Sequence, residues 1–186
     1  MTSSGPYTQA LARTHMWSFV DRRGPYSAKK PSYDEMLGEQ RGHGRSPSSL
    51  MAALDRIPAL STFKRIVERA GMRPLLESSQ AEITLFAPVN GSYGEWERVL
   101  PTLRVGTARV IVNASILPIR LPEGLLRGCP VCTYNGRGDR SRMYVDNLCG
   151  VTEINRIATV VEYDVPNIGN GVLHLTHGVV LPLKSC

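Results

Sequence analysis

Residues Asn170 to Pro182, which read NGVLHLTHGVVLP, form a block in which apolar and β-branched residues dominate. Turn residues precede the block and Pro182 closes it, so it predicts a buried strand pair or one long bent strand. Gly178, within the block, suits a bulge or a bend. A second block, Ile83 to Asn90 (ITLFAPVN), has a similar strand-forming character. We therefore expect the two segments to lie side by side in the core of one domain.

Taken together and in this order, the two blocks resemble the motifs of the fasciclin domain. TLFAPVN (84–90) is similar to the motif near the start of that domain, and the Asn170 to Pro182 block to the motif near its end. STFKRIVERAGM (61–72) resembles its first long helix, and ARVIVNASILP (108–118) its central helix and following turn. TYNGR (133–137) resembles its TLNG turn.

The resemblance covers roughly residues 49–183 and implies an α/β (α+β) fold. It implies a wedge-shaped mixed β-sandwich with several packed helices over residues 49–186. His174 matches the histidine of the second motif, and the resemblance implies a structural role for it. Thr176 and His177 replace the usual Ile and Asp, so we expect a different side-chain pairing there.

Two helices can be placed from capping residues and periodicity. The first is expected to begin at Ser48 or Ser49 and to be broken by Pro58. The second covers 62–70, where apolar residues recur at helical spacing, and Gly71 is its expected C-cap.

The remaining segments are assigned more coarsely. Residues 74–76 are expected to lead into a loop, and 96–103 to form a short helix broken by Pro101. Periodicity leaves helix and strand open for 107–117, where the resemblance implies a helix. Short strands separated by turns are expected at 131–134, 142–147, 150–154 and 158–163.

Composition indicates one basic domain preceded by an arm, residues 1–48. The chain of 186 residues carries 22 basic and 16 acidic groups, a net charge of +6. The arm and residues 49–186 each carry +3, so the short arm is the more basic part per residue. Neither a long apolar run nor an apolar N-terminal region is visible, so we expect no transmembrane helix, no secretory signal and an intracellular location.

The arm is rich in Gly, Pro and Ser and cannot bury enough apolar area to fold alone. Basic and aromatic residues interleave with prolines in its second half, and they are Arg22, Arg23, Tyr26, Lys29, Lys30 and Tyr33. This pattern predicts an extended peptide that lies along an acidic protein surface, the alternative being a solvated tail. Nucleic acid is a less favoured partner because no recognised nucleic-acid fold accompanies the arm.

Two motifs in the domain carry alternative functions. Arg137-Gly138-Asp139 is an RGD tripeptide in a turn, which would suit extracellular adhesion, although an Arg- and Gly-rich chain produces such tripeptides by chance. Four cysteines could form a zinc site or a redox pair, or could be ordinary thiols, and they are Cys129, Cys132, Cys149 and Cys186. A single CxxC pair favours the ordinary thiols.

No pattern typical of an enzyme is found. A nucleophile elbow and a phosphate-binding glycine loop are missing, and Glu95 and Glu97 have the character of solvated surface. We expect a non-enzymatic structural or interaction protein without a cofactor. Its arm would anchor it in a large intracellular assembly with acidic surfaces, such as a microtubule-based axoneme or a virion capsid. The sequence does not separate these two, and it leaves self-association open.

Overall fold

A computed structural model of the chain describes residues 47–128, 131–135, 142–165 and 168–182. The chain divides into two units, Met1–Ser32 and Tyr33–Cys186, and every described residue belongs to the second unit. The predicted arm, residues 1–48, therefore lies outside the described residues except for its last two positions. Within the described residues, no helix is long and apolar enough to cross a membrane.

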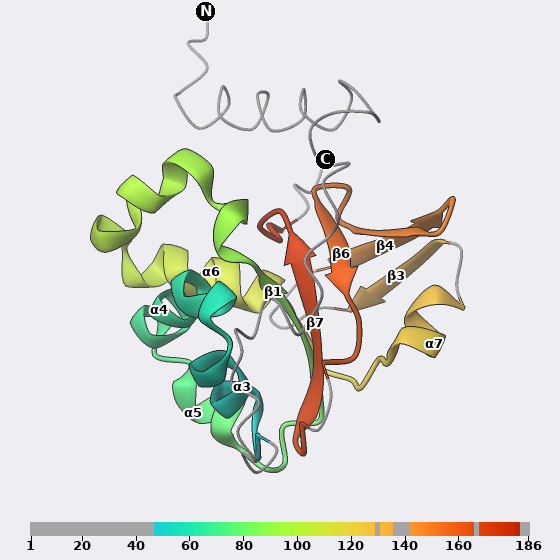
Figure 1. Cartoon of the computed structure of the whole chain (residues 1–186), viewed down its shortest axis with the longest axis horizontal. Coiled ribbons are helices and arrows are strands. Elements are labelled where there is room, and N and C mark those ends of the chain that lie inside the picture. Colours follow the sequence, from blue (N-terminus) through green and yellow to red (C-terminus); the bar gives the residue numbers. More distant parts are fainter. Residues whose placement is uncertain (1–46, 129–130, 136–141, 166–167, 183–186) are drawn as a thin grey trace, which may run out of the picture. The chain divides into compact units, whose positions relative to one another are not determined.

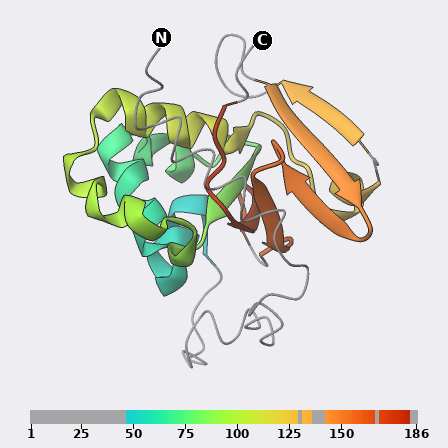
Figure 2. The same ribbon diagram turned by 90° about the horizontal axis from the view of Figure 1, so that it is seen from above.

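Within the described residues, seven strands form one sheet with the order β2-β1-β7-β6-β5-β4-β3. The strands are β1 Ile83–Pro88, β2 Ile116–Leu117, β3 Val131–Asn135, β4 Arg142–Leu148, β5 Val151–Ile154, β6 Ala158–Glu162 and β7 Gly171–His177. β1 and β7 are parallel, and the other neighbours are antiparallel. Figure 2 shows the β3–β4 end of the sheet turning away from β7. The expected sandwich of two sheets is not confirmed, because all seven strands belong to one hydrogen-bonded sheet.

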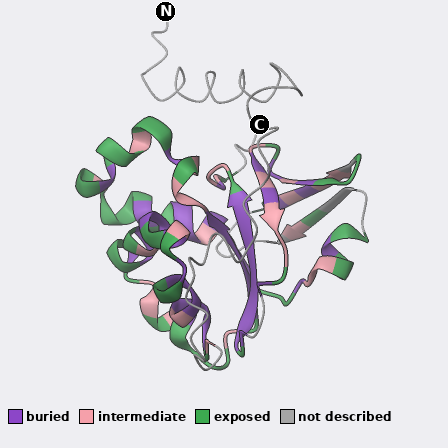
Figure 3. Cartoon of the chain, viewed as in Figure 1, coloured by how far each residue is buried: buried purple, intermediate pink, exposed green. Residues whose placement is uncertain are grey.

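The two motif strands are neighbours, as expected. Leu85 of β1 lies opposite Leu173 of β7, and Phe86 lies opposite His174. Successive side chains of a strand point to opposite faces, so these two pairs lie on opposite faces of the sheet. Both strands are buried along almost their whole length (Figure 3). Burial on both faces explains why their sequences are nearly continuous in apolar residues.

Helices cover one face of the β1–β7 pair. The α-helices are α3 Leu50–Arg56, α4 Ser61–Ala70, α5 Arg73–Glu77, α6 Val105–Ala114 and α7 Glu123–Arg127, and the 3-10 turns are η2 Pro58–Leu60, η3 Asn90–Ser92, η4 Gly94–Arg98 and η5 Leu100–Thr102. In Figure 1, α3 to α6 lie to one side of β1 and β7, whereas α7 lies with β3 and β4 on the other side.

The domain has two hydrophobic cores, one on each face of the β1–β7 pair. The first packs α3, α4 and α6 against Leu85 and Leu173. The second gathers Phe86, Val145 and Ile154 with Leu126 of α7. The curled sheet therefore encloses the second core, and α7 covers part of it.

The predicted helices are confirmed at their ends as well as in their apolar faces. The Ser49 hydroxyl accepts a hydrogen bond from the Ala52 N–H at 3.1 Å and caps α3. α4 buries the four residues that define its predicted apolar face, Phe63, Ile66, Val67 and Ala70. Gly71 ends α4 with a φ of 68°, in the left-handed region that favours glycine.

Three local expectations are corrected. Residues 74–76 belong to helix α5 rather than to a loop. Pro74 is tolerated because it stands in the first turn, where a helix leaves the backbone N–H groups unpaired. The region 96–103 forms the 3-10 turns η4 and η5 instead of one short helix. The C-terminal motif is a single strand that ends at His177, followed by a bend at Gly178 with a φ of 99°.

Candidate functional site

The binding residues predicted from the sequence fall mostly outside the described part of the chain. This holds for the six arm residues Arg22, Arg23, Tyr26, Lys29, Lys30 and Tyr33, for the tripeptide Arg137, Gly138 and Asp139, and for Cys129 and Cys186. Cys132 lies on β3, but its side chain is not described. The arrangement of these predicted groups therefore lies outside the described residues, and the arm and the tripeptide stay predictions.

The two strands that flank the tripeptide are described and form a regular ladder. β3 and β4 pair antiparallel, and the last pair of the ladder is Asn135 with Arg142. Tyr134 packs against the second core and so holds the β3 end of this hairpin to the domain. Residues 136–141 join two strands whose ends are fixed as neighbours.

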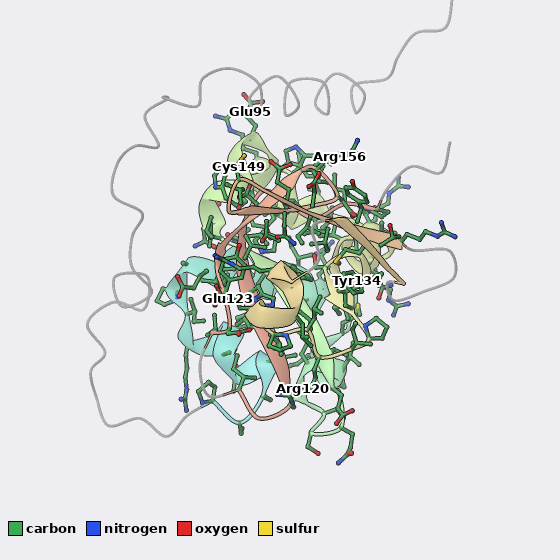
Figure 4. All side chains as sticks on the ribbon, turned by 90° about the vertical axis from the view of Figure 1, so that its right-hand side faces the viewer. Glu95, Arg120, Glu123, Tyr134, Cys149 and Arg156 are labelled. Atoms are coloured by element: carbon green, nitrogen blue, oxygen red, sulfur yellow. The ribbon has the colours of Figure 1, made fainter. Side chains whose placement is uncertain are left out.

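Cys149 is the predicted thiol whose environment is described. It lies in the two-residue turn between β4 and β5, with a φ of 53°, and its side chain is exposed. Figure 4 shows it at the surface of the ribbon. Among the described residues, no group of three or more His, Cys, Asp or Glu side chains could hold a metal ion.

The buried His174 is the centre of a polar network that the sequence did not reveal. Its Nε2 lies 2.9 Å from the carbonyl oxygen of Leu121, and its Nδ1 accepts a hydrogen bond from the Asp164 N–H at 3.2 Å. A carbonyl oxygen only accepts, so the ring is neutral with its proton on Nε2. Burial lowers the pKa of His174, more than the Leu121 hydrogen bond and the nearby carboxylates raise it. The ring packs against Phe86 and Tyr163.

The same network holds α7 on the sheet. The Asp164 carboxylate accepts a hydrogen bond from the Glu123 N–H, 2.9 Å away, at the start of α7. Arg127 near the end of α7 forms an ion pair with Glu123 at 3.0 Å and stacks over the Tyr163 ring at 4.2 Å. Asn147 of β4 donates to the Leu126 carbonyl oxygen at 2.8 Å. Helix α7 is thus fixed to β4 and to the β6 end of the sheet.

Although His174 and Asp164 lie close together, their geometry is structural rather than catalytic. The Asp164 carboxylate is 3.9 Å from Nδ1, and Nδ1 already accepts from a backbone N–H. Because both ring nitrogens bind backbone groups and the ring is 0% exposed, no lone pair is available to a substrate. The structural role expected for His174 is confirmed by these contacts.

Asparagines of the two motifs clamp helices to the sheet. Asn90, which follows β1, accepts from the Thr62 N–H at 3.0 Å and caps α4 from a distant part of the chain. Asn170, just before β7, accepts from the Leu50 N–H at 2.8 Å and donates to the carbonyl oxygens of Leu76 and Ser78 at 2.9 and 2.7 Å. It therefore joins the start of α3, the end of α5 and the start of β7.

Comparison with solved structures finds a similar fold. Over 74% of this chain and 51% of the other, the domain superposes on a FAS1 domain pair from the insect cell adhesion molecule fasciclin I, with a TM-score of 0.59 and 16% sequence identity. The domain has a fasciclin-like fold. The chain spans about half of that two-domain structure. No family model matches the sequence. No curated protein matches it either.

The fasciclin-like fold explains the sequence motifs as structural devices. Asn90 and Asn170 bind backbone groups of the helices, and the parallel β1–β7 pair places both motifs side by side. The departure at Thr176 is accommodated locally, because its hydroxyl donates to the Gly178 carbonyl oxygen at 3.2 Å. His177 lies on the opposite face of β7 from His174 and is exposed. The two histidines therefore do not approach one another.

Proposed function

We propose that this chain is a non-enzymatic protein-interaction module. The fasciclin-like domain is its rigid docking block, and the basic arm, residues 1–48, is a tether to acidic protein surfaces. The observation that carries the proposal is that three buried or half-buried polar side chains of the sequence motifs are engaged within the fold itself. His174, Asn90 and Asn170 all bind the chain's own backbone, so they stabilise the fold.

The cellular setting that we propose is a large intracellular assembly, such as a microtubule-based axoneme or a virion capsid. Its support is the net charge of +6, of which the arm carries half, because such a charge favours acidic partner surfaces. The fasciclin-like neighbour is itself described as a cell adhesion molecule, and this supports an interaction role in general.

The arm is tested by charge reversal within the full chain. Arg22→Glu, Arg23→Glu and Lys29→Glu together should reduce co-purification with the parent assembly. A matched control, Arg13→Glu with Arg41→Glu and Arg45→Glu, makes the same charge change elsewhere in the arm and should leave co-purification nearly unchanged. Equal loss in both variants would indicate a general charge effect, and no loss in either would refute the tether.

A second candidate function is extracellular adhesion through Arg137, Gly138 and Asp139. The observation that favours it is the β3–β4 ladder, whose closing pair Asn135 and Arg142 fixes both ends of the connecting residues. Cells plated on the immobilised chain in the presence of magnesium should then attach, and Asp139→Glu should abolish attachment. The neighbouring Ser141→Ala is the control. Attachment that survives Asp139→Glu would exclude this function.

A further inference from the structure

A depression of about 270 Å³ lies between helix α4 and the 3-10 turn η5. Its lining combines apolar and charged side chains and consists of Arg65, Ile66, Glu68, Arg69, Leu100, Pro101 and Leu103. Small-molecule sites usually occupy about 300–1,000 Å³. The depression lies just below this range and has room for a side chain of a bound peptide.

The floor is apolar and belongs to the folded core. Ile66 is 2% exposed and Leu100 is 8% exposed, so neither side chain moves without disturbing the core. The two walls are joined, because Arg69 of α4 donates a hydrogen bond from Nε to the Leu103 carbonyl oxygen. Val99 and Val105, which flank the η5 segment in sequence, are 53% and 49% exposed. Exposed apolar side chains that adjoin a buried apolar floor in the sequence are typical of a protein-binding surface.

Positive charges outnumber negative charges in the lining of this depression. Arg65 and Arg69 line it, and Arg98 and Arg104 are exposed on either side of η5 in the sequence. Glu68 also lines it, but its carboxylate forms an ion pair with Arg73 at 3.2 Å. Within the described residues, no ion pair engages Arg65, Arg98 or Arg104.

The nearest acidic residues by sequence do not cancel this charge at the depression itself. Glu95 and Glu97 belong to η4 and are exposed, and neither lines the depression. Figure 4 shows the Glu95 side chain projecting away from the ribbon. Guanidinium groups that lack a carboxylate partner favour a ligand with carboxylates, and the apolar floor favours an apolar side chain. A ligand that carries both would be complementary to the depression.

We propose that the depression between α4 and η5 docks an acidic segment of a protein partner. One leucine-sized side chain of the partner inserts against Ile66 and Leu100, and carboxylates on either side of it pair with Arg65 and Arg104. This inference rests on the proposed interaction function, and it assigns the domain its own docking surface separate from the arm. A second copy of this chain is a poorer occupant, because its net charge of +6 opposes self-docking.

The test is a binding titration on the full chain. The probe is a fluorescein-labelled peptide with one central leucine flanked by glutamates. Its binding is measured by fluorescence anisotropy at low and at physiological salt. Arg65→Glu with Arg104→Glu should weaken binding by about tenfold or more, because two attractive pairs become repulsive. Val99→Ser with Val105→Ser alters only exposed side chains and should weaken binding about threefold through the lost apolar surface.

Control variants and probes separate docking from general attraction to a basic protein. Arg142→Glu with Arg156→Glu makes the same charge change at exposed arginines of the β4–β6 region and should bind as the wild type does. The peptide with alanine in place of its leucine should bind markedly less well. If the control reversal weakens binding equally, or if the alanine peptide or a single-stranded RNA binds as tightly, the proposal is overturned.

A failure here is distinguishable from a failure of the proposed function. If the peptide does not bind but the full chain still co-purifies with its assembly through the arm, the docking surface is refuted and the interaction module remains. If peptide binding depends on Arg65 and Arg104 but reversing the arm charges changes nothing, the docking surface is supported and the tether is refuted. Sedimentation of the unlabelled chain over a range of concentrations tests self-association, and a dimer lost in Arg65→Glu would replace the acidic partner with a second copy.

Discussion

His174 on β7 donates from Nε2 to the carbonyl oxygen of Leu121, 2.9 Å away, and so ties the segment before α7 to an interior strand of the sheet. The opposite ring nitrogen accepts from the Asp164 backbone N–H. Protonation of the ring would turn this acceptor into a second donor facing an N–H group. The contact therefore depends on a neutral imidazole.

Acidification should destabilise the domain through His174. Its pKa is lowered by burial from an ordinary value of 6.5, so the unfolded state takes up a proton at a higher pH than the folded state does. Stability is complete above the unfolded pKa and falls as the pH drops through it. We expect stability to fall between about pH 7.5 and 5.5, by at most about 1.4 kcal/mol for this one proton, measured by urea denaturation.

Variants identify the group responsible for this pH dependence. His174→Gln should lower stability at both pH values but flatten its slope, whereas His177→Gln, on the exposed face, should keep the wild-type slope. Glu162 titrates in the opposite sense, since burial and Glu123 raise its pKa. Glu162 contributes equally to both proteins, so subtracting the slope of His174→Gln from that of the wild type leaves the contribution of His174 alone. An unchanged slope in His174→Gln would disprove the assignment.

Asn170→Ala should be among the most destabilising single changes outside the apolar cores. It leaves the Leu50 N–H and the carbonyl oxygens of Leu76 and Ser78 without their partner in a buried region. We expect a loss of about 3 kcal/mol in the free energy of unfolding. Asn90→Ala also removes three hydrogen bonds, including a helix cap, but at a more exposed site where water replaces them, and should cost about 1 kcal/mol. Guanidinium denaturation measures the free energy of unfolding of both variants. Similar losses would contradict the greater importance of Asn170.

Gly178 should not tolerate a side chain. Its φ of 99° is unfavourable for other residues, and a Cβ there would overlap with the Ile157 carbonyl oxygen. Gly178→Ala should therefore lower stability by about 2–4 kcal/mol. Gly106, exposed in the first turn of α6 with open space around it, provides the matched control. Gly106→Ala should raise stability by about 0.5 kcal/mol, measured as a shift of the thermal midpoint.

Cys149 should react rapidly with a maleimide in the native protein, because it is exposed in the β4–β5 turn. Cys149→Ser should remove the fast-reacting thiol, and a chelator should leave the thermal midpoint unchanged. A zinc site built from Cys129, Cys132, Cys149 and Cys186 predicts the reverse result. One equivalent of zinc by elemental analysis, with Cys149 protected until the chelator is added, would establish that site.

The elements found from the sequence are those whose stabilising contacts are local or periodic. Helix α4 shows its apolar spacing and its Gly71 cap within one short segment, and β7 shows a continuous apolar run. Helix α7 was not predicted, although Pro122, Glu123 and Arg127 follow the usual order of helix start, acidic first turn and basic last turn. Five residues give too little periodicity to be recognised.

The polar clamps could not be read from the sequence. Asn170 binds Leu50 from 120 positions away, and His174 binds Leu121 from 53 positions away. Nothing in the local sequence identifies such partners. The depression between α4 and η5 was likewise not predicted, since it depends on the approach of two segments that are separated by about thirty residues.

The position of β7 in the sheet has a consequence for biosynthesis. The last strand of the domain lies between β1 and β6, so until it leaves the ribosome β1 has only the two-residue β2 as a partner, and both cores lack a wall. Pairing strands so far apart along the chain is slow, and nascent chains would expose unpaired strand edges while they wait. Folding of this domain therefore waits for the synthesis of β7, and a holding chaperone would find its binding surface on the newly made β1.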